Sequence, residues 1–366
     1  MNEHELAILR QFCLDAEPAS CTPYGCGHIN RTYLVATAGG RCYILQKINH
    51  HTFRDVAGLM ENIELVTEHL RRKSPDPRSV LTLIRTKDGK SYLEADDGYW
   101  RVFRFVEDSI CLQQPESDAD FYESAVGFGT FQQLLSDFPA EKLHETIPNF
   151  HNTPDRYRAL LETLTRDPMH RAAQVQPEIE FALARQAEMA ALQNALDAGE
   201  LPLRVTHNDT KLNNVLFDAK TRRALCIIDL DTVMPGSALY DYGDSIRFGA
   251  ATAAEDEREL DKMEMSLERF RVFTRGYVRA CPGLTQKELE LLPLGAKVMT
   301  MECGVRFLTD HIDGDNYFSI HREGQNLDRA RTQFKLVADM ERKWDKMKEI
   351  VNEEVQNAKE NGSCCI

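Results

Sequence analysis

One short segment of the chain combines an aspartate, a lysine and an asparagine at a spacing that suits phosphoryl transfer. Such a transfer passes through a loose transition state whose charge spreads over the phosphate oxygens, so the protein mainly positions the reactants and neutralises charge. A carboxylate can orient the attacking hydroxyl, an ammonium can contact the phosphate, and amide and carboxylate oxygens suit Mg²⁺. The side chains in question belong to His207, Asp209, Lys211 and Asn214, followed by Asp229 at the end of the apolar strand 224–228.

Protein kinases place the same parts in the same order: a catalytic Asp, an Asn on a metal ion, and an Asp that ends a following strand. We therefore predict that Asp209 orients the acceptor hydroxyl or accepts its proton, and that Lys211 contacts the transferred phosphate. Asn214 and Asp229 are the predicted Mg²⁺ ligands. Turn chemistry explains an isolated Asp or Asn in a loop, but it does not explain this combination.

Two further polar residues lie next to these groups. We interpret His207 as a packing and hydrogen-bonding support. Asp231 follows Asp229 on the alternate position of the strand and points the same way if the strand continues. Two roles are open for Asp231: a second metal ligand, or a solvated or capping carboxylate.

Length and composition narrow the class of protein. With 366 residues, two lobes around a cleft are the default expectation. The formal net charge of -14 argues against nucleic acid or an anionic membrane surface as a partner. No stretch resembles a signal peptide or reaches the roughly 18 apolar residues of a membrane helix.

The cysteines indicate a reducing compartment. The ten cysteines include no C-x-x-C pair, which is typical of reduced thiols in a cytoplasmic protein. Cys364 and Cys365 do not match the prenylation pattern, because Ser363 is the fourth residue from the end. We predict a cytoplasmic protein with a frayed C-terminal tail.

A glycine-rich turn in residues 23–35 is the predicted nucleotide lid. After a short helix at 5–14, Gly25 and Gly27 would let the backbone approach phosphates closely. The third glycine of the usual pattern is replaced by Asn30. Taken alone, the segment is nearly as well explained by an ordinary hairpin turn.

The strand at 41–48 should carry a phosphate-binding lysine, but Gln46 occupies the expected position. Lys47 is next to it and points to the other face of a regular strand. Either Gln46 serves as a neutral hydrogen-bonding group, or a bulge lets Lys47 substitute. We favour Gln46.

The remainder of the N-terminal region is predicted to form a helix and a small sheet of about five strands. Apolar residues recur at helical spacing in 53–70. Glu61 and Glu64 are the candidates on this helix to face the phosphate site, although exposed-face charge explains either one. Further strands are expected at 81–84, 91–94 and 99–106, and the last one leads to a hinge at Val106 whose backbone could bind adenine.

From residue 111 onward the periodicity is mostly helical. The apolar stripe in the last predicted helix could form a dimer contact, but we favour its use in covering the C-terminal lobe. Helices are predicted at 121–135, 177–196, 255–278, 286–307 and 326–355.

These elements together predict an α+β, bilobal, protein-kinase-like fold. The N-terminal lobe, residues 1–107, would combine a small antiparallel sheet with one long helix and bind nucleotide. The C-terminal lobe, residues 108–366, would be mostly helical and hold the catalytic and substrate-binding groups.

The His207 segment and Asp229 resemble the aminoglycoside phosphotransferase and choline kinase branch of kinase-like folds, which phosphorylates small molecules. Across nearly the whole chain the sequence is similar to the N-acetylhexosamine 1-kinase family, in which Gln46 also looks normal. The resemblance implies ATP- and Mg²⁺-dependent phosphorylation of the anomeric hydroxyl of N-acetylglucosamine or N-acetylgalactosamine. It is carried by residues 17–20, 23–30, 43–46, 64–67, 204–214, 227–232, 234–237, 243–249 and 301–308.

This resemblance also implies a sugar site with directional hydrogen-bonding groups and an apolar patch for the acetamido methyl. Surface salt bridging is the competing explanation for three of its candidates, Arg306, Asp310 and Tyr317. Asp241 and Asp244 are expected to brace the catalytic loop. The sugar-site candidates are His28 and Asn30 on the lid, and Arg306, Asp310 and Tyr317 in the helical lobe.

Three hypotheses therefore remain at the level of sequence: an N-acetylhexosamine 1-kinase, a kinase of another sugar, choline or an aminoglycoside, and a nucleotide-binding pseudokinase scaffold. Cationic substrates favour acids and aromatics, whereas the sequence offers Arg306. Retention of Asp209, Asn214 and Asp229 argues against the scaffold. The expected partners are ATP and a small sugar, and the chain could be a monomer or a homodimer.

Overall fold

The computed structural model describes residues 3–25 and 29–362 and divides the chain into two compact units. The sheet unit contains Met1–Cys111, Asp137–Pro148 and Val215–Pro235, and the helical unit contains Leu112–Ser136, Asn149–Asn214 and Gly236–Ile366. The chain therefore crosses between the units more than once. The division into a nucleotide-binding lobe and a catalytic lobe at residue 107 remains a prediction.

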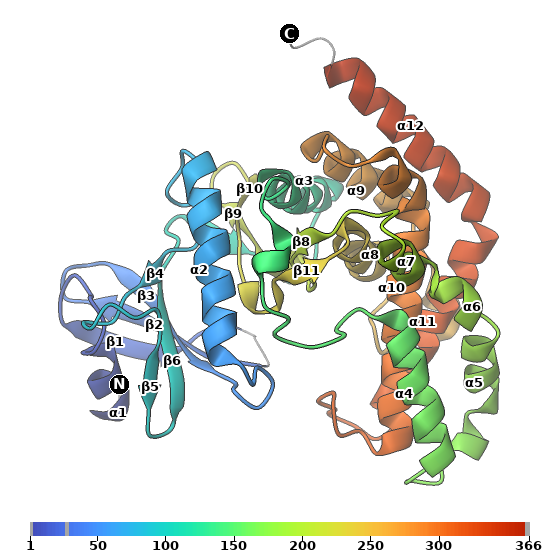
Figure 1. The fold of residues 1–366 in the computed structure, drawn as a ribbon, viewed down its shortest axis with the longest axis horizontal. Helices are drawn as coiled ribbons and strands as arrows, with labels where there is room; N and C mark the ends of the chain where they lie inside the picture. The colour runs from blue at the N-terminus through green and yellow to red at the C-terminus, as the bar shows by residue number, and fades with distance from the viewer. Residues whose placement is uncertain (1–2, 26–28, 363–366) are drawn as a thin grey trace. The chain divides into compact units, whose positions relative to one another are not determined.

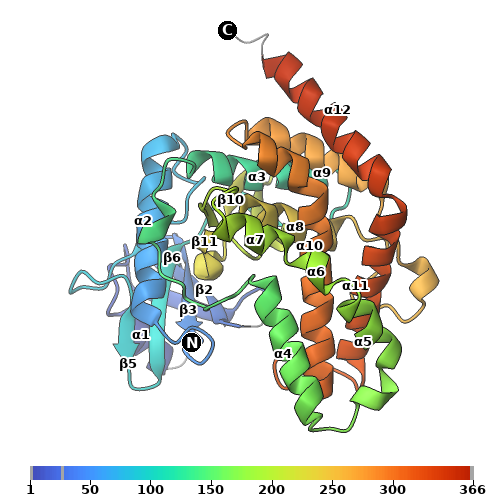
Figure 2. The ribbon, with the colours of Figure 1, turned by 45° about the vertical axis from the view of Figure 1, so that its right-hand side comes forward.

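The sheet unit is built on an antiparallel sheet of six strands with the order β1-β2-β3-β6-β4, and β5 also pairs with β6. Figures 1 and 2 show helix α2 running alongside this sheet. A second sheet of this unit has the order β10-β9-β7. The strands are β1 (Pro18–Pro23), β2 (Arg31–Thr37), β3 (Cys42–Ile48), β4 (Leu83–Ile84), β5 (Leu93–Ala95), β6 (Gly98–Arg104), β7 (Ser109–Cys111), β9 (Val215–Asp218) and β10 (Ala224–Ile227), and the helices are α1 (Glu3–Leu9) and α2 (Val56–Lys73).

Strand alternation gives the larger sheet two different faces. On one face, Trp100 and Val102 belong to an apolar core that includes Ile8 and Leu9 of α1. On the other face, Gln46 and Arg101 stand opposite each other in a regular register between β3 and β6. The sheet therefore buries one apolar layer and offers a polar row on its other side.

Helix α10, with 28 residues, is the centre of the helical unit and packs against α4, α8, α11 and α12, while α9 packs against α3 and α12. A capping box of Thr285 and Glu288 starts α10, and Gly314 ends it in the left-handed conformation. Besides α10 (Gln286–Asp313), the unit contains α3 (Asp118–Leu134), α4 (Thr153–Arg166), α5 (Gln176–Leu183), α6 (Gln186–Met189), α7 (Ala191–Asp197), α8 (Ala238–Gly249), α9 (Leu267–Ala280), α11 (Gln325–Arg342) and α12 (Trp344–Gly362), and the short strand β8 (Arg204–Thr206) leads to the catalytic loop.

Several predicted helices differ from the structure, and the first of them, expected at 5–14, ends at Leu9. The helix expected at 177–196 is divided into α5, α6 and α7. The helix expected at 255–278 begins only after Ser266, whose side chain accepts the N–H of Arg269 and caps α9. The last helix is split at Lys343. Most of its apolar stripe is buried within the chain, as expected for covering the helical part, and Trp344 is partly exposed; the buried members are Phe334, Val337, Met340, Met347 and Val351.

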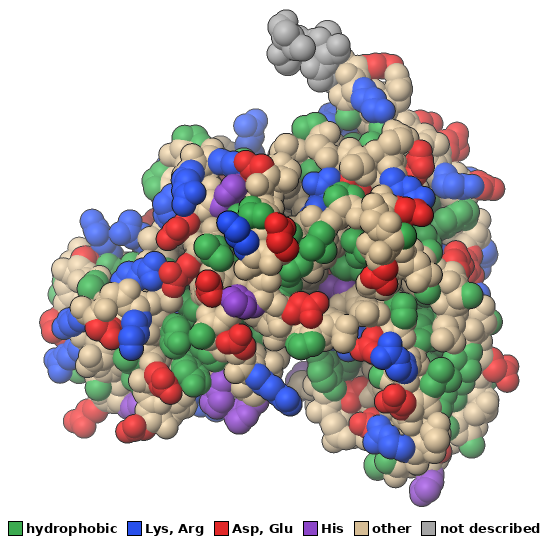
Figure 3. Space-filling view, viewed as in Figure 1, with side chains coloured by type: hydrophobic (Ala, Val, Ile, Leu, Met, Phe, Trp, Pro, Cys, Tyr) green, Lys and Arg blue, Asp and Glu red, His purple; other side chains and the backbone are tan. Residues whose placement is uncertain are grey.

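None of the helices formed by residues 3–25 and 29–362 combines the length and the apolar run that a bilayer span needs. Acidic and basic side chains are interspersed on the face of the molecule shown in Figure 3. The same described residues include seven cysteines with free thiols.

Candidate active site

The catalytic loop follows β8 in the helical unit and brings Asp209 and Lys211 into contact. The Lys211 Nζ lies 2.7 Å from Asp209 Oδ1. The Asp209 side chain is 28% exposed, so solvent and a small molecule can reach it. The structure thus presents the predicted carboxylate and ammonium as one accessible pair.

The ion pair controls the charge of both groups. Burial opposes the charged form of Asp209, but the adjacent Lys211 ammonium and a hydrogen bond from Asn214 hold its pKa below the usual aspartate value. The Asp209 carboxylate in turn raises the pKa of Lys211. Asp209 is therefore ionised and Lys211 protonated over the physiological pH range.

Asn214 has the orientation that a metal ligand needs. Its Nδ2 donates to the Asp209 carbonyl at 2.8 Å and to Asp209 Oδ2 at 3.2 Å. Because the amide nitrogen faces Asp209, the Oδ1 atom is turned away from it, and an amide oxygen is a ligand that Mg²⁺ accepts. The Asn214 side chain is thus chemically suitable as one of the two predicted cation ligands.

Helix α8 holds the catalytic loop through the side chains of Asp241 and Asp244, as predicted for these two residues. The Asp241 carboxylate accepts the backbone N–H groups of His207 at 2.9 Å and Asn208 at 2.8 Å. Asp244 accepts the N–H of Thr210 at 3.0 Å. The backbone on both sides of Asp209 is therefore fixed by buried carboxylates.

A buried pair that the motif did not indicate supports the same loop. His151 lies between Glu302 of α10, with Nδ1 to Oε1 at 2.8 Å, and the carbonyl of Asn208, with Nε2 to O at 3.2 Å. The ring of His207 packs against Phe128 at a centroid distance of 5.6 Å, which agrees with its predicted structural role. Both histidines hold the backbone that carries Asp209.

The second predicted metal ligand, Asp229, belongs to the sheet unit. It adopts a left-handed conformation with φ 59° and ψ 56° and begins the 3₁₀ helix Leu230–Thr232. This conformation is costly for a residue other than glycine and persists where the surroundings fix it. The Thr146 hydroxyl donates to the Asp231 carbonyl, and the Asn62 amide donates to the Val233 carbonyl, so this segment is fixed on several sides.

Asp231 is neither solvated nor a helix cap. Its carboxylate is buried and faces the guanidinium of Arg101, with Nη1 to Oδ1 at 2.5 Å and Nη2 to Oδ2 at 2.9 Å. Asn30 Nδ2 donates to Asp231 Oδ2 at 2.5 Å, and Asn30 Oδ1 accepts the N–H of Asn49. The predicted sugar contact of Asn30 therefore stays a prediction that would require its side chain to exchange these bonds.

The structure excludes the bulge that would bring Lys47 to the position of Gln46. Strand β3 pairs with β2 and β6 in an unbroken register. Lys47 Nζ lies 2.6 Å from Asp97 Oδ2 and over the Trp100 ring on the opposite face. Gln46 Nε2 donates to Thr32 Oγ1 and its Oε1 accepts from Arg101 Nε at 2.9 Å.

The other residues predicted to contact the nucleotide lie on the lid, on α2 and at the hinge. Gly25 has φ 78°, which favours glycine, whereas Gly27 and His28 lie outside the described residues. Glu64 pairs with Arg85 at 2.9 Å. The Val106 carbonyl accepts the Ser109 hydroxyl. Their nucleotide roles remain predictions.

The three sugar candidates of the helical unit come together at the end of α10. The Arg306 guanidinium lies 5.6 Å from the centre of the Tyr317 ring and 5.2 Å from that of Phe150, and Arg306 Nη2 donates to the Tyr317 hydroxyl. Asp310 accepts the backbone N–H of Tyr317 at 2.8 Å. Tyr317 is 63% exposed, whereas Asp310 is buried and its carboxylate also accepts the N–H groups of Asn316 and Phe318.

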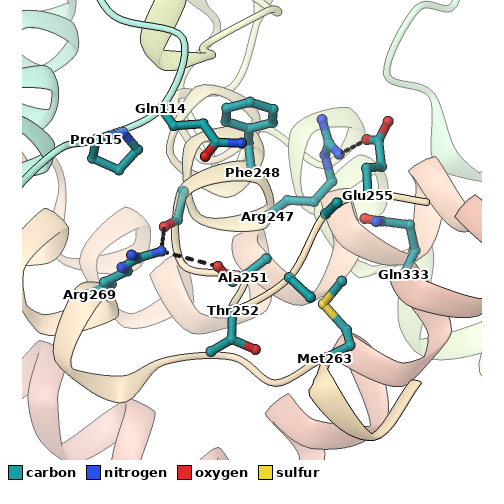
Figure 4. A pocket seen from close by; sticks show the side chains of 13 residues that line it. Gln114, Pro115, Arg247, Phe248, Ala251, Thr252, Glu255, Met263, Arg269 and Gln333 are labelled. Atoms are coloured by element: carbon teal, nitrogen blue, oxygen red, sulfur yellow. Dashed lines mark hydrogen bonds and ion pairs between the residues drawn. The ribbon is translucent and has the colours of Figure 1, made fainter. Parts of the chain in front are cut away.

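A cavity of about 240 Å³ lies elsewhere in the helical unit (Figure 4). Its wall includes Arg247, which pairs with Glu255 and with the Asp244 carboxylate. Arg269 donates to backbone carbonyls of the same wall. None of the predicted site residues lines this cavity, so we do not assign it as the acceptor site.

Comparisons with known proteins identify the family of the chain. A family model described as "Phosphotransferase enzyme family" matches residues 20–272. The chain therefore belongs to this family of phosphotransferases.

Solved structures with the same fold include a choline kinase from Cryptosporidium parvum Iowa II, with a TM-score of 0.60, 12% identity and coverage of 96% of this chain and 98% of that one. A microcompartment-associated aminopropanol kinase has a TM-score of 0.58 and 15% identity over 94% and 98% of the two chains. An amicoumacin kinase in complex with AMP-PNP and Ca²⁺ has a TM-score of 0.56 and 14% identity over 92% and 93%. The predicted α+β, protein-kinase-like fold is confirmed.

Sequence reasoning missed several groups that support the site. Arg101, His151 and Asn62 lie outside the motif, and each has its partner far away in the chain, for example Arg101 and Asp231 at a separation of 130 residues. A polar residue in a strand whose neighbours are apolar, as Arg101 is among Trp100, Val102 and Phe103, is the one local signal that could have indicated a buried partner.

Proposed function

We propose that this phosphotransferase is an N-acetylhexosamine 1-kinase, which transfers the terminal phosphate of ATP to the anomeric hydroxyl of N-acetylglucosamine or N-acetylgalactosamine. Asp209 orients that hydroxyl and receives its proton, and Lys211 contacts the phosphate. Mg²⁺, when bound, neutralises phosphate charge, and Asn214 and Asp229 are the residues that would hold it. The AMP-PNP and Ca²⁺ of the similar amicoumacin kinase support a nucleotide and a divalent cation.

The observation that carries the acceptor class is the connection between the catalytic loop and the Arg306 cluster. His151 bonds to the Asn208 carbonyl, and its neighbour Phe150 packs against Arg306. Glu302, which binds His151, precedes Arg306 by about one helical turn on α10. A neutral, hydroxyl-rich acceptor suits a cluster of arginine and aromatic rings, whereas a cationic amine would be repelled by the guanidinium.

Other residues complete the proposal. We assign nucleotide contacts to Gly25, Gly27, Gln46, Glu64 and the backbone at Val106. We assign sugar contacts to His28, Asn30, Arg306, Asp310 and Tyr317. A cytoplasmic location, a monomer or homodimer, and the lack of nucleic-acid or membrane partners remain parts of this proposal.

The test is an ADP-release assay with Mg²⁺ and ATP over a panel of free sugars and amino alcohols. We expect the highest kcat/KM with the two N-acetylhexosamines. Arg306→Met should raise the KM for the sugar and leave the affinity for Mg·AMP-PNP unchanged. The matched control is Arg166→Met, which removes an exposed ion pair with Asp313 in the same unit. Preference for choline or an amino alcohol would refute the sugar assignment.

A further inference from the structure

The polar face of the sheet carries a row of three directly opposed residues, Thr32 on β2, Gln46 on β3 and Arg101 on β6. The three side chains are linked in sequence, because Gln46 donates to Thr32 and accepts from Arg101. Arg101 is 1% exposed and also contacts Met60 of α2. Its guanidinium ends this row at Asp231.

This row determines which end of the Gln46 amide is available. The Oε1 atom is used by Arg101 Nε at 2.9 Å, so the amide nitrogen is the end directed away from Arg101. One hydrogen of Nε2 goes to Thr32 Oγ1 at 3.1 Å. The other hydrogen has no acceptor within the described residues, and an N–H donor is what a phosphate oxygen requires.

The same guanidinium fixes the segment that contains Asp229. Arg101 Nη2 donates to Asp231 Oδ2 at 2.9 Å and Nη1 lies 2.5 Å from Oδ1, so the planar guanidinium sets the orientation of the carboxylate as well as its distance. Asp231 is two residues after Asp229, whose left-handed backbone needs support from its surroundings. Asn30 binds the same carboxylate and so links the end of the β1–β2 loop to this pair.

We propose that Arg101 is a positioning residue of the nucleotide site, which orients the Gln46 amide toward the phosphates and holds the Asp229 segment in its metal-binding conformation. The inference rests on the proposed function, since it assumes a Mg²⁺-nucleotide substrate. It explains how a neutral glutamine can serve on β3: the cation of this site stands on the neighbouring strand and acts through Gln46 and Asp231.

The test compares two variants that leave no buried charge without a partner. Arg101→Lys retains the charge without the two-pronged geometry. Arg101→Met combined with Asp231→Leu replaces the buried pair by apolar side chains of similar size, a change that buried ion pairs often tolerate. Lys47→Met is the matched control, because it removes a cation from the other face of the same strand.

Isothermal titration with Mg·AMP-PNP and thermal unfolding are measured for each variant. We expect the double variant to unfold cooperatively and to bind Mg·AMP-PNP about 10 to 100-fold more weakly, as is typical when a group that orients a metal ligand is lost. Arg101→Lys should also be weakened, with a higher Mg²⁺ requirement and an unchanged KM for the acceptor. Lys47→Met should bind as the wild type does.

Wild-type affinity in the folded double variant, or in Arg101→Lys, would overturn the inference and leave the pair a purely stabilising contact. A wild-type protein that binds no Mg·AMP-PNP would instead overturn the proposed function, and the inference with it. The two failures are distinguished by the wild-type protein, which binds Mg·AMP-PNP in the first case and does not bind it in the second.

Discussion

The segments that carry Asp229 and Asp209 are both held by buried carboxylates, but the two carboxylates have different partners. In the sheet unit, Asp231 is paired with the Arg101 guanidinium. In the helical unit, Asp241 accepts two backbone N–H groups of the catalytic loop. An ion pair makes a segment depend on the charge of one distant residue, whereas a carboxylate that accepts N–H groups fixes the backbone itself.

The two carboxylates also differ in what holds their charge. Burial raises the pKa of Asp241, and the nearby His207 with hydrogen bonds from the loop and Gln132 opposes that rise. Asp231 instead faces a full positive charge. We therefore expect the stability of the sheet unit to depend on the charge of Asp231, and the stability of the helical unit to depend on the hydrogen bonds that Asp241 accepts.

The largest expected effect is that of Asp209→Asn, which should change turnover without changing nucleotide binding. It should lower kcat by about 10² to 10⁴-fold, because the acceptor hydroxyl loses its proton acceptor. The affinity for Mg·AMP-PNP, measured by calorimetry, should change little, since the nucleotide contacts are assigned elsewhere. Asp137→Asn, which alters an exposed ion pair with Lys73, serves as the control. Near-normal turnover in Asp209→Asn would refute the catalytic assignment.

Neutralising each brace compares the two segments directly. Asp231→Asn should lower the free energy of unfolding by about 3 to 5 kcal/mol, because it leaves the buried Arg101 charge without a partner. Asp241→Asn should cost about 1 to 3 kcal/mol, since an amide can keep some of the backbone bonds. Chemical denaturation provides both values.

The matched control for these braces is Ser237→Ala, which removes the N-terminal cap of α8 without touching the catalytic loop. It should cost about 1 kcal/mol and leave kcat unchanged. Equal losses of stability in Asp231→Asn and Asp241→Asn would contradict the contrast between a charge-dependent and a geometry-dependent brace.

Much of the catalytic loop could be predicted because its residues lie within eight positions of one another, so local spacing reports their function. The brace by Asp241 and Asp244 was accessible only through the family resemblance. The Arg101–Asp231 pair was not predicted, because strand register and a separation of 130 residues bring it together and neither leaves a periodic signal.

The elements of the fold likewise divide into those that the sequence predicts and those that it does not. The long helix α2 and most strands of the sheet follow from apolar periodicity and turn residues. Helix α8 was not predicted, because it is buried nearly all round and several of its buried residues are polar, so residue type does not mark its buried positions. The helix expected at 255–278 was placed too early because the capping role of Ser266 was not recognised.

The close packing of α8 gives a third prediction. A Cβ atom at Gly243 would lie 2.3 Å from the Gly295 carbonyl of α10, so Gly243→Ala must push the two helices apart. We expect a loss of about 1 to 3 kcal/mol in the free energy of unfolding. The displacement should also lower kcat, because α8 carries Asp241 and Asp244. Unchanged stability and turnover would show that the loop does not depend on the position of α8.

The smallest expected effect concerns pH. The Lys211 ammonium helps to hold the pKa of Asp209 below its usual value, so in the wild type the acidic limb of kcat/KM should lie below the usual aspartate range. Lys211→Met removes this charge and leaves burial, which raises the pKa of Asp209. The acidic limb should therefore move to higher pH, as measured by pH profiles of kcat/KM with thermal unfolding as the control. An unmoved limb would contradict the coupling.

The most direct test of the account is the position of the phosphate in the product. Wild-type protein is incubated with Mg²⁺, ATP and N-acetylglucosamine or N-acetylgalactosamine, and phosphorus NMR identifies the proton to which the new phosphate couples. The account predicts coupling to the anomeric proton, and formation of the same product about 10² to 10⁴-fold more slowly with Asp209→Asn. Coupling to a proton at another carbon, or phosphate transfer only to an amino alcohol, would contradict it.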